Sequence, residues 1–435
     1  MRALCSAYGA SPNTIQHVLA ALVREAQVET VPGRGSFVAE QPDARKGVDV
    51  SWQSLALGPM PSRAEDLAPL LSVVPPGEIS LRGGYPDSSL QPVAALNAAL
   101  GRACRRPGVW DRQPSAGNLD LRAWFAREAS PALSASDALI VPGGQSGLAV
   151  AIRALCPPRT PLLVESPTYV GALAVARAAG VVPVPVPTDS DGVLPGPLEM
   201  ALKSTGARVI YLQPTFANPS GALLTEARRV EVLALARAAG AFVIEDDYAH
   251  DLQLDPSVRV PPPLVARDPG RVVYIRSLTK SAAAGLRIAA VCSQGPVAAR
   301  LRAARAADDL FVSGPLQEAA LELVTSPAWP RHLRSLTRAL RERRDAGVEA
   351  VRAWRGASLP LVPGGGYSLW VELPRGVDDA AFAVEAARVG VHITQGSIWF
   401  PAEPTAPFLR LSFAAADVPA LREGISRLSG LSRGP

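Results

Sequence analysis

Residues 272–280 read Val-Val-Tyr-Ile-Arg-Ser-Leu-Thr-Lys, a short apolar run that is followed within five residues by a lysine. Similar runs lie at Ala138–Val141, Leu162–Glu165, Val181–Val186, Val209–Leu212, Phe242–Glu245 and Ile288–Cys292. Most of them are separated by stretches of helical character that are rich in Ala, Leu and Arg. Short apolar strands that alternate with helices are typical of a mostly parallel sheet covered on both faces. The sequence therefore predicts an α/β fold over residues 79–432.

The end of the chain has a different pattern. Residues 296–356 are predicted to form long helices, and the strands and closing helix that follow predict a smaller α+β part. These later elements are expected near Tyr367–Glu372, Val391–Thr394, Leu409–Phe413 and residues 417–429. We place the smaller subdomain mainly at 315–435.

Lysine is rare in this chain, since only Lys46, Lys203 and Lys280 occur among 44 basic residues. Arginine serves on most surfaces as well as lysine does, but its guanidinium stays protonated and forms no Schiff base. A lysine just beyond a buried strand can have a lowered pKa and act as a nucleophile. Lys280 is therefore a candidate functional residue, with an ordinary surface lysine as the alternative.

The composition indicates a chain with a large folded core. Hydrophobic residues make up 48 % and charged residues 19 %, which excludes an intrinsically disordered chain. No apolar run approaches the roughly 18 residues of a membrane helix and no signal peptide is evident, so we expect no membrane contact and a cytoplasmic location. The four cysteines form no cluster with each other or with histidine, so we expect neither a disulfide framework nor a metal site. The net charge of +5 allows contact with nucleic acid without requiring it.

Three further motifs follow predicted strands, where ligands bind in parallel sheets. Small residues at 141–147 (Val-Pro-Gly-Gly-Gln-Ser-Gly) would let backbone N–H groups at a helix start hold a phosphate, although a tight turn explains them as well. Asn218-Pro219-Ser220-Gly221 is either a turn or part of a site. The paired acids of Asp246-Asp247-Tyr248 either cap a loop or need a cationic partner when buried.

Taken together, the order and spacing of these motifs resemble the fold-type I pyridoxal-phosphate enzymes of the aspartate aminotransferase superfamily, over roughly residues 79–430. The resemblance implies pyridoxal 5′-phosphate as cofactor and Lys280 as the residue that forms the internal aldimine with it. It also implies that Asp246, rather than Asp247, pairs with the pyridinium nitrogen and makes the ring an electron sink.

The same resemblance implies roles for the remaining candidates. Tyr169 would stack on the cofactor ring, and Tyr248 and Asn218 would hydrogen-bond its phenolic oxygen. Four residues would hold the phosphate: Gly144, Gln145, Ser277 and Arg287. Arg410 would grip a substrate carboxylate with its planar fork, with an ordinary strand-edge arginine as the alternative.

One segment departs from the family pattern. The family usually carries Tyr-Gly-x-Pro-x-Gly before its first large-domain helix, and the tyrosine reaches the phosphate of the partner subunit. The matching residues 112–122 of this chain contain no tyrosine. The family nevertheless implies a homodimer.

The first 41 residues predict a different module. Ser11 and Pro12 open a helical pattern at 12–26, and Gln27–Val31 and Ser36–Val38 predict two strands around Pro32-Gly33-Arg34-Gly35. A helix followed by such a hairpin resembles the winged helix-turn-helix of GntR-type regulators. That module normally begins with another helix, and this chain is expected to start inside the second helix of the module. The resemblance implies DNA contact through Ser11, Asn13, Thr14, Gln16 and Arg34. A small capping subdomain without DNA contact is the alternative.

The whole chain is thus predicted to have a winged helix at 1–41, a linker at 42–78 and an aminotransferase-like domain at 79–435. This arrangement resembles the MocR subfamily of GntR regulators. It implies a transcriptional regulator whose DNA binding responds to an amino compound in the pyridoxal-phosphate site. A class I/II aminotransferase acting on amino acids is the main alternative, and a non-enzymatic scaffold with an empty pocket is the third.

A basic series at 331–344 completes the candidates. Arg331, Arg334, Arg338 and Arg341 recur at helical spacing and share one face. A solvated helix face is the simpler interpretation of this pattern. A patch that contacts the DNA backbone is the functional alternative.

Overall fold

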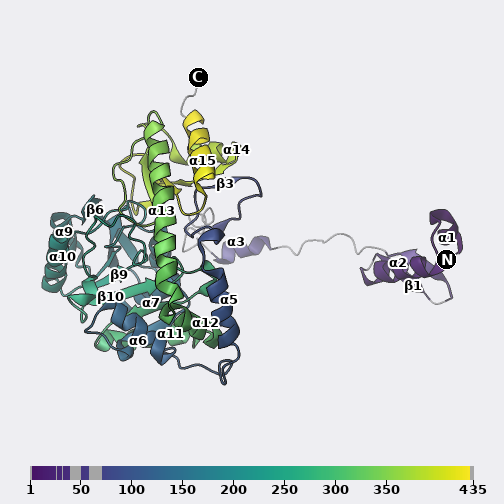
Figure 1. Cartoon of the computed structure of the whole chain (residues 1–435), viewed down its shortest axis with the longest axis horizontal. Helices are drawn as coiled ribbons and strands as arrows, with labels where there is room; N and C mark the ends of the chain where they lie inside the picture. Colours follow the sequence, from purple (N-terminus) through teal and green to yellow (C-terminus); the bar gives the residue numbers. More distant parts are fainter. Residues whose placement is uncertain (1, 26, 32, 40–49, 58–70, 432–435) are drawn as a thin grey trace. The chain divides into compact units, whose positions relative to one another are not determined.

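The computed structural model describes residues 2–25, 27–31, 33–39, 50–57 and 71–431 (Figure 1). The chain divides into two compact units, residues 1–60 and 61–435. Much of the predicted linker, at 42–49 and 58–70, lies outside the described residues. Between these two gaps lies the short helix α3, Ser51–Leu57.

The first unit begins with two helices, α1 (Arg2–Tyr8) and α2 (Pro12–Arg24). Helix α2 starts where the sequence predicts, because Ser11 is its N-cap and accepts a hydrogen bond from the backbone N–H of Thr14 at 3.2 Å. The antiparallel hairpin of β1 (Val28–Val31) and β2 (Gly35–Val38) follows. The structure thus contains the predicted helix and hairpin.

An eight-stranded sheet forms the centre of the second unit, in the order β4-β11-β10-β9-β8-β5-β6-β7. The strand bounds are β4 Ala138–Val141, β5 Pro161–Ser166, β6 Val182–Asp189, β7 Gly192–Val193, β8 Val209–Leu212, β9 Phe242–Asp246, β10 Val272–Ser277 and β11 Ala289–Cys292. The five strands from β10 to β6 pair in parallel, whereas β11 and β7 are antiparallel to their neighbours. The prediction of a mostly parallel α/β sheet is confirmed.

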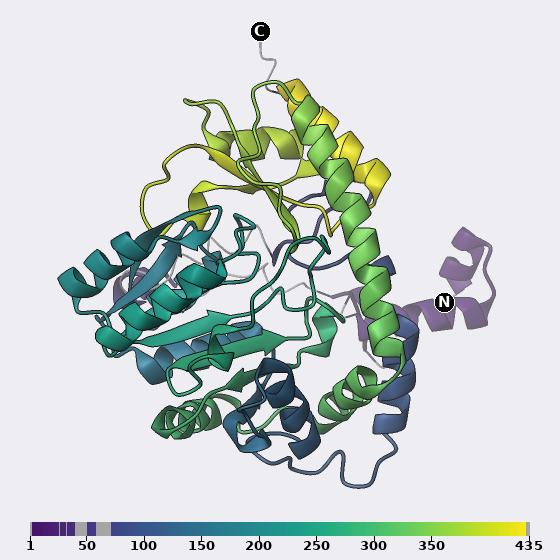
Figure 2. The same cartoon turned by 60° about the vertical axis from the view of Figure 1, so that its left-hand side comes forward.

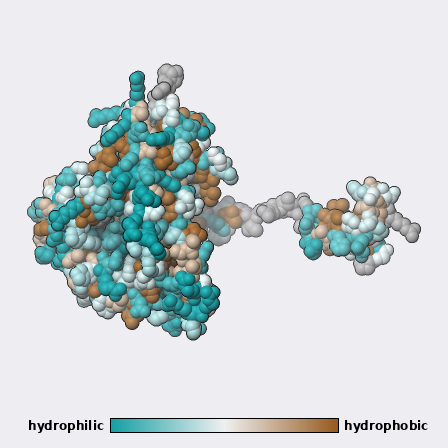
Figure 3. All heavy atoms as spheres, viewed as in Figure 1, coloured by the Kyte–Doolittle hydropathy of each residue, from teal (hydrophilic) through white to brown (hydrophobic). Residues whose placement is uncertain are grey.

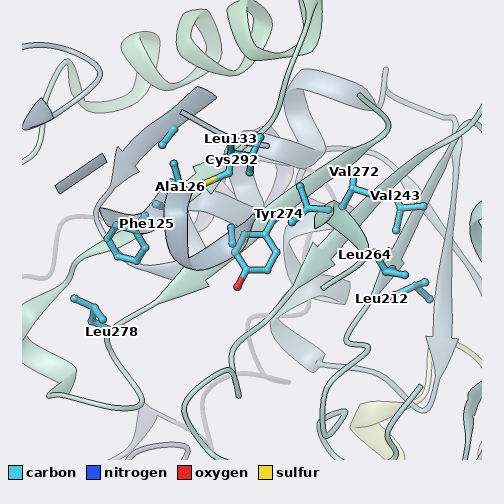
Figure 4. Close-up of a cluster of buried hydrophobic side chains, with 14 of the residues drawn as sticks. Phe125, Ala126, Leu133, Leu212, Val243, Leu264, Val272, Tyr274, Leu278 and Cys292 are labelled. Carbon is cyan, nitrogen blue, oxygen red and sulfur yellow. The ribbon is translucent and has the colours of Figure 1, made fainter. Parts of the chain in front are cut away.

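Both faces of this sheet are buried, as the apolar strands predict. Along β10, Val272 and Tyr274 pack into one hydrophobic cluster (Figure 4), while Val273 and Ile275 pack into another on the opposite face. Helices lie on both sides of the sheet (Figure 2). Their bounds are α5 Val93–Ala103, α6 Leu119–Ala129, α7 Gly144–Leu155, α8 Val170–Ala178, α9 Pro195–Thr205, α10 Glu226–Ala238, α11 Pro296–Asp309 and α12 Gly314–Thr325.

The C-terminal part adds a second, smaller layer. A three-stranded sheet has β15 (Phe408–Ser412) between β12 (Ser368–Glu372) and β14 (Thr394–Gln395). The predicted strand at 391–394 is divided, because β13 (Val391–His392) pairs instead with β3 (Ile79–Ser80). Two helices, α14 (Asp379–Arg388) and α15 (Val418–Leu431), complete this layer.

Helix α13, Ala328–Ala353, connects the two layers (Figure 1). Near its start, Trp329 belongs to the core on the large sheet, whereas Leu336 and Leu340 belong to the core of the C-terminal layer with Leu369. One continuous helix therefore contributes to both cores. Within the described ranges, no helix has the length and apolar character needed to cross a membrane.

Candidate functional site

A cavity of about 370 Å³ lies where strands of the large sheet end, next to the C-terminal layer. All ten site residues predicted for the second unit line it: Gly144, Gln145, Tyr169, Asn218, Asp246, Tyr248, Ser277, Lys280, Arg287 and Arg410. These residues are separated by up to 266 positions in the sequence, so the fold alone brings them together. Parallel strands place their carboxyl ends along one edge of the sheet, which is where the β8, β9 and β10 residues meet.

Lys280 follows β10 and points into the cavity. Its Nζ atom donates a hydrogen bond to the carbonyl oxygen of Gly84 at 2.6 Å and lies 4.0 Å from the ring centroid of Tyr85. Burial, reinforced by the positive charges of Arg410 and Arg287, lowers the pKa of Lys280 to about 7, although the nearby Asp246 opposes this. A large fraction of the amine is therefore unprotonated at neutral pH, the form that attacks an aldehyde.

The backbone around Lys280 is held from two sides. The hydroxyl of Tyr367 donates to the carbonyl oxygen of Lys280, and a ring nitrogen of His332 on α13 lies 2.7 Å from the carbonyl oxygen of Ser281. These contacts fix the direction in which the lysine side chain leaves the chain.

Asp246 and Asp247 separate into two environments. One carboxylate oxygen of Asp246, Oδ2, accepts hydrogen bonds from Tyr211 at 2.8 Å and from Gln213 at 2.9 Å. Burial raises the pKa of Asp246, although the two hydrogen bonds and Lys280 act against the shift. Asp246 thus presents a carboxylate to the cavity with one oxygen already satisfied.

Asp247 points away from the cavity. Its Oδ2 atom lies 2.8 Å from Nδ1 of His250 and accepts a hydrogen bond from Tyr274 at 2.7 Å. Burial by itself would raise its pKa, but His250 and Tyr274 lower the pKa below its usual value. The structure therefore gives Asp247 a partner of its own, whereas Asp246 lines the cavity.

An anion-binding cradle lies at the start of α7. Its N-cap, Gly143, has φ +96° and supplies no capping side chain, so the first N–H groups of the helix are available to an anion. The guanidinium of Arg287 donates to the carbonyl of Pro142 at 2.8 Å, and a Cβ atom on Gly143 would lie only 2.5–2.9 Å from its atoms. Ser277 packs against Gly144. This combination of helix terminus, arginine and small residues suits a phosphate group.

Four tyrosines line the cavity, and the sequence analysis assigned roles to two of them, Tyr169 and Tyr248. Tyr169 donates from its hydroxyl to Oε1 of Gln145 at 3.0 Å, and its ring covers Gly171, where a Cβ atom would overlap it. Tyr248 donates to the carbonyl oxygen of Phe216 at 2.6 Å. Burial raises the pKa of both phenols. Both are therefore neutral hydrogen-bonding groups at physiological pH, and Tyr248 already uses its proton within the chain.

Arg410 is 3 % exposed and lies on β15, the central strand of the smaller sheet. Its Nε atom donates to Oδ1 of Asn218 at 2.9 Å, and one Nη atom donates to the carbonyl oxygen of Arg82 at 3.2 Å. Burial lowers its pKa to about 10. Among the residues that the structure describes, no carboxylate forms an ion pair with it. The interpretation as a strand-edge arginine is wrong, and a buried cation of this kind needs an anionic ligand.

These groups fit pyridoxal 5′-phosphate part by part. The cradle at Gly143 and Arg287 suits its phosphate, Asp246 suits its ring nitrogen, and the unprotonated amine of Lys280 suits its aldehyde. The fold and the site together are those of the fold-type I class of pyridoxal-phosphate-dependent proteins. The chain belongs to the aminotransferase class I and II family, whose sequence profile matches residues 94–428.

Relatives with known names include regulators and enzymes. The chain is 28 % identical over 356 residues to the uncharacterized HTH-type transcriptional regulator YdfD of Bacillus subtilis, covering 80 % of this chain and 73 % of the relative. It is 26 % identical to the uncharacterized HTH-type transcriptional regulator YjiR of Escherichia coli, covering 98 % of this chain and 92 % of the relative. It is also 29 % identical to 2-aminoadipate transaminase of Thermus thermophilus, covering 82 % and 91 %.

Among solved structures, the chain is similar to LysN, an α-aminoadipate aminotransferase of Thermus thermophilus, with a TM-score of 0.78 and 26 % identity. The match covers 87 % of this chain and 97 % of LysN, which was crystallised with N-(5′-phosphopyridoxyl)-L-leucine. The predicted resemblance to regulators that carry an aminotransferase-like domain is confirmed by these comparisons. The prediction of pyridoxal 5′-phosphate as cofactor is confirmed as well.

Sequence reasoning missed several residues of the cavity. Gln213 directly follows the predicted strand Val209–Leu212, so the strand-end rule could have found it. Tyr85 and Trp399 lie in segments without a strand pattern, and no local signal marks them.

The predicted DNA-contact residues are all exposed on the first unit: Ser11, Asn13, Thr14, Gln16 and Arg34. The hydroxyls of Ser11 and Thr14 lie 2.8 Å apart, so both take part in the cap of α2. Arg34 lies in the turn between β1 and β2.

The basic series on α13 is only partly solvated. Arg331, Arg334 and Arg338 are exposed, and hydrophilic side chains cover this stretch of the surface in Figure 3. Arg341 instead donates to the carbonyl oxygen of Leu254. Two further arginines are buried and bind backbone carbonyls, Arg343 at Ala414 and Arg344 at Pro363.

Replacing Gly143 with alanine should weaken cofactor binding by about tenfold or more. The added Cβ atom would enter the space of the Arg287 guanidinium and would force a side chain into a conformation with φ +96°. Equilibrium dialysis of the chain with pyridoxal phosphate measures the effect. Gly196→Ala is the matched control, because a Cβ atom there meets nothing within 4 Å. Unchanged affinity in Gly143→Ala would contradict a phosphate site at this position.

Proposed function

We propose that this chain is a pyridoxal-phosphate-binding transcriptional regulator of the GntR type, whose DNA binding responds to an amino compound in the cavity. The observation that carries the proposal is the presence, on one chain, of a helix-and-hairpin unit and of a cavity whose groups suit the phosphate, ring nitrogen and aldehyde of the cofactor. The HTH-type regulator YjiR, which is similar along 98 % of this chain, supports it.

The domain assignment follows the same proposal: a winged helix at 1–41, a linker at 42–78 and the cofactor domain at 79–435. Asn13 and Gln16 would contact bases or phosphates from α2, while Arg34 would enter the minor groove from the hairpin. A homodimer would place two such units on paired half-sites.

In the cavity, each residue has a proposed part. Lys280 binds the cofactor aldehyde, Arg287 and the start of α7 hold the phosphate, and Asp246 keeps the ring nitrogen protonated. Asn218, Tyr169 and Tyr248 orient the ring. When bound, the cofactor supplies an electron sink and an aldehyde that exchanges amines. Arg410 holds the carboxylate of an incoming amino compound, and the new contacts shift the balance between two arrangements of the chain.

The test is DNA binding by the full holo-protein to the region upstream of its own gene, across a series of salt concentrations. Specific binding with a steep salt slope is expected, because phosphate contacts release counterions. Arg34→Ala should reduce that slope by about one unit, whereas Arg300→Ala, at an exposed arginine of α11 outside the basic series, is the control. Absence of sequence-specific binding at every salt concentration would contradict the regulator.

A class I/II aminotransferase is the second candidate. The buried Arg410, which has no carboxylate partner within the described residues, together with Lys280 and Asp246, forms a set that transamination could use. The similarity to 2-aminoadipate transaminase supports this candidate. Turnover of an amino-acid pool with a 2-oxo acid, measured alongside the DNA experiment, would favour it if DNA affinity were absent.

A further inference from the structure

Part of the cavity wall is used neither by the cofactor nor by a ligand carboxylate. Its side chains come from separate segments and share one property, the absence of charge: Leu71, Tyr85, Leu148, Tyr367 and Trp399. The hydroxyl of Tyr367 is already used, since it donates to the carbonyl oxygen of Lys280. This uncharged wall, as we call it, is the surface that remains for the side chain of a ligand.

Three of the four charged side chains that line the described cavity have other tasks. Asp246 is held by Tyr211 and Gln213, Arg287 lies in the anion cradle, and Lys280 faces the amine position. Only Arg410 remains for a ligand anion. Among the residues that the structure describes, a second carboxylate on the ligand would therefore be buried without a cation, which is strongly unfavourable.

Arg82 could in principle supply a second cation, because its backbone carbonyl accepts a hydrogen bond from Arg410. Its guanidinium, however, donates to the carbonyl oxygen of Ser72 at 2.9 Å, and Arg82 does not line the cavity. The guanidinium of Arg82 thus binds the backbone rather than a ligand.

Aromatic rings lie next to Lys280 and Arg410, the two groups that would bind the amine and the carboxylate of an amino acid. The Tyr85 ring centroid lies 4.0 Å from Nζ of Lys280, and the Trp399 ring centroid lies 5.0 Å from Cζ of Arg410. The backbone of Trp399 is anchored, since its carbonyl oxygen accepts a hydrogen bond from the N–H of Thr168 at 2.9 Å. The amine, carboxylate and side chain of an α-amino acid leave the same carbon, so a side chain bound here meets these rings.

The geometry points to an α-amino acid with an uncharged, apolar side chain, aromatic or aliphatic, as the ligand of this cavity. Tyr85 and Trp399 are then the residues that determine specificity. The inference rests on the proposed function, in which an amino compound enters the site, and it adds the chemical class of that compound.

Spectral titration of the holo-protein with matched ligands tests it. Norleucine and 2-aminoadipate share their chain length and differ in the end group, a methyl against a carboxylate. Norleucine should bind at least about 30-fold more tightly, because the uncharged wall has no cation for the second carboxylate. Phenylalanine should bind roughly 10- to 100-fold more tightly than alanine, because its ring buries apolar surface against the wall.

Substitutions at Tyr85 and Trp399 test whether the uncharged wall causes this difference in affinity. Tyr85→Ala, at a residue that is 40 % exposed, should weaken phenylalanine at least about tenfold more than it weakens alanine. Trp399→Phe should also reduce the ratio of the affinity for phenylalanine to the affinity for alanine, by a smaller factor. Met200→Ala, exposed on α9 and absent from the cavity wall, is the control.

Two results would overturn the inference in different ways. If 2-aminoadipate binds as tightly as norleucine, the cavity supplies a second cation, and the ligand class is wrong while an amino-acid ligand stands. If no α-amino acid changes the spectrum of the holo-protein, the proposed amino-compound response fails and the inference fails with it.

Discussion

Lys280→Ala is expected to abolish the covalent attachment of pyridoxal 5′-phosphate to the chain. Of the two lysines that the structure describes, Lys280 lines the cavity, whereas Lys203 is exposed on α9 and forms an ion pair with Glu199 at 2.6 Å. The amine of Lys280 is also the one whose pKa falls to about 7, mainly through burial. Borohydride reduction followed by peptide mass spectrometry should place one phosphopyridoxyl group on the Lys280 peptide of the unmodified chain and none on the variant.

Two further variants distinguish the loss of the covalent bond to the cofactor from a loss of folding. Lys203→Ala removes a lysine of the same unit and should keep full labelling. Lys280→Arg keeps a cation beside Gly84 and Tyr85 but forms no bond to the aldehyde, so it should remain folded by circular dichroism and unlabelled. Undiminished labelling of Lys280→Ala would assign the attachment to another lysine and remove the central role of Lys280.

Arg410→Leu is expected to weaken ligands that carry a carboxylate by at least about 100-fold. A guanidinium and a carboxylate form two charge-assisted hydrogen bonds, each contributing about 1.5–3 kcal/mol. Asn218 holds the Nε side of Arg410, which leaves its outer edge for such a pair. Phenylalanine and phenethylamine are the matched ligands, because they differ only in the carboxylate. Spectral titration of the holo-protein should show the loss for phenylalanine and less than about a threefold change for phenethylamine.

Arg410→Lys tests the shape of the fork, since it keeps the positive charge but loses the planar pair of donors. Its affinity for phenylalanine should fall between those of the unmodified chain and Arg410→Leu. Arg338→Leu, at an exposed position of α13, is the control. Equal losses for phenylalanine and phenethylamine in Arg410→Leu would indicate general damage to the cavity and would contradict a carboxylate site.

Local patterns predicted the parts of the site that follow strands. Lys280, Asp246 and the glycines before α7 were found because a parallel sheet gathers the ends of its strands, a rule that needs no knowledge of tertiary contacts. The preference for Asp246 over Asp247 came from a family resemblance. The structure adds the physical reason: His250 and Tyr274 occupy Asp247, while Tyr211 and Gln213 present Asp246 to the cavity.

Other features could not be predicted because they depend on pairs that are distant in sequence. The bond from Arg410 to Asn218 spans 192 positions, and neither local motif specifies it. Arg343 and Arg344 illustrate the same limit. Both belong to a basic series that is typical of a solvated helix face. Both are nevertheless buried, and the carbonyl oxygens of Ala414 and Pro363 accept their hydrogen bonds.

Helix α13 gives the lysine a mechanical connection to the C-terminal layer. His332 contacts the carbonyl oxygen of Ser281, next to Lys280, while Leu336 and Leu340, one and two turns further along, are packed into the core around Leu369. A helix transmits displacement along its axis far better than a loop does, because its backbone hydrogen bonds resist bending. The smaller sheet that contains Arg410 and the backbone beside Lys280 therefore contact the same continuous helix.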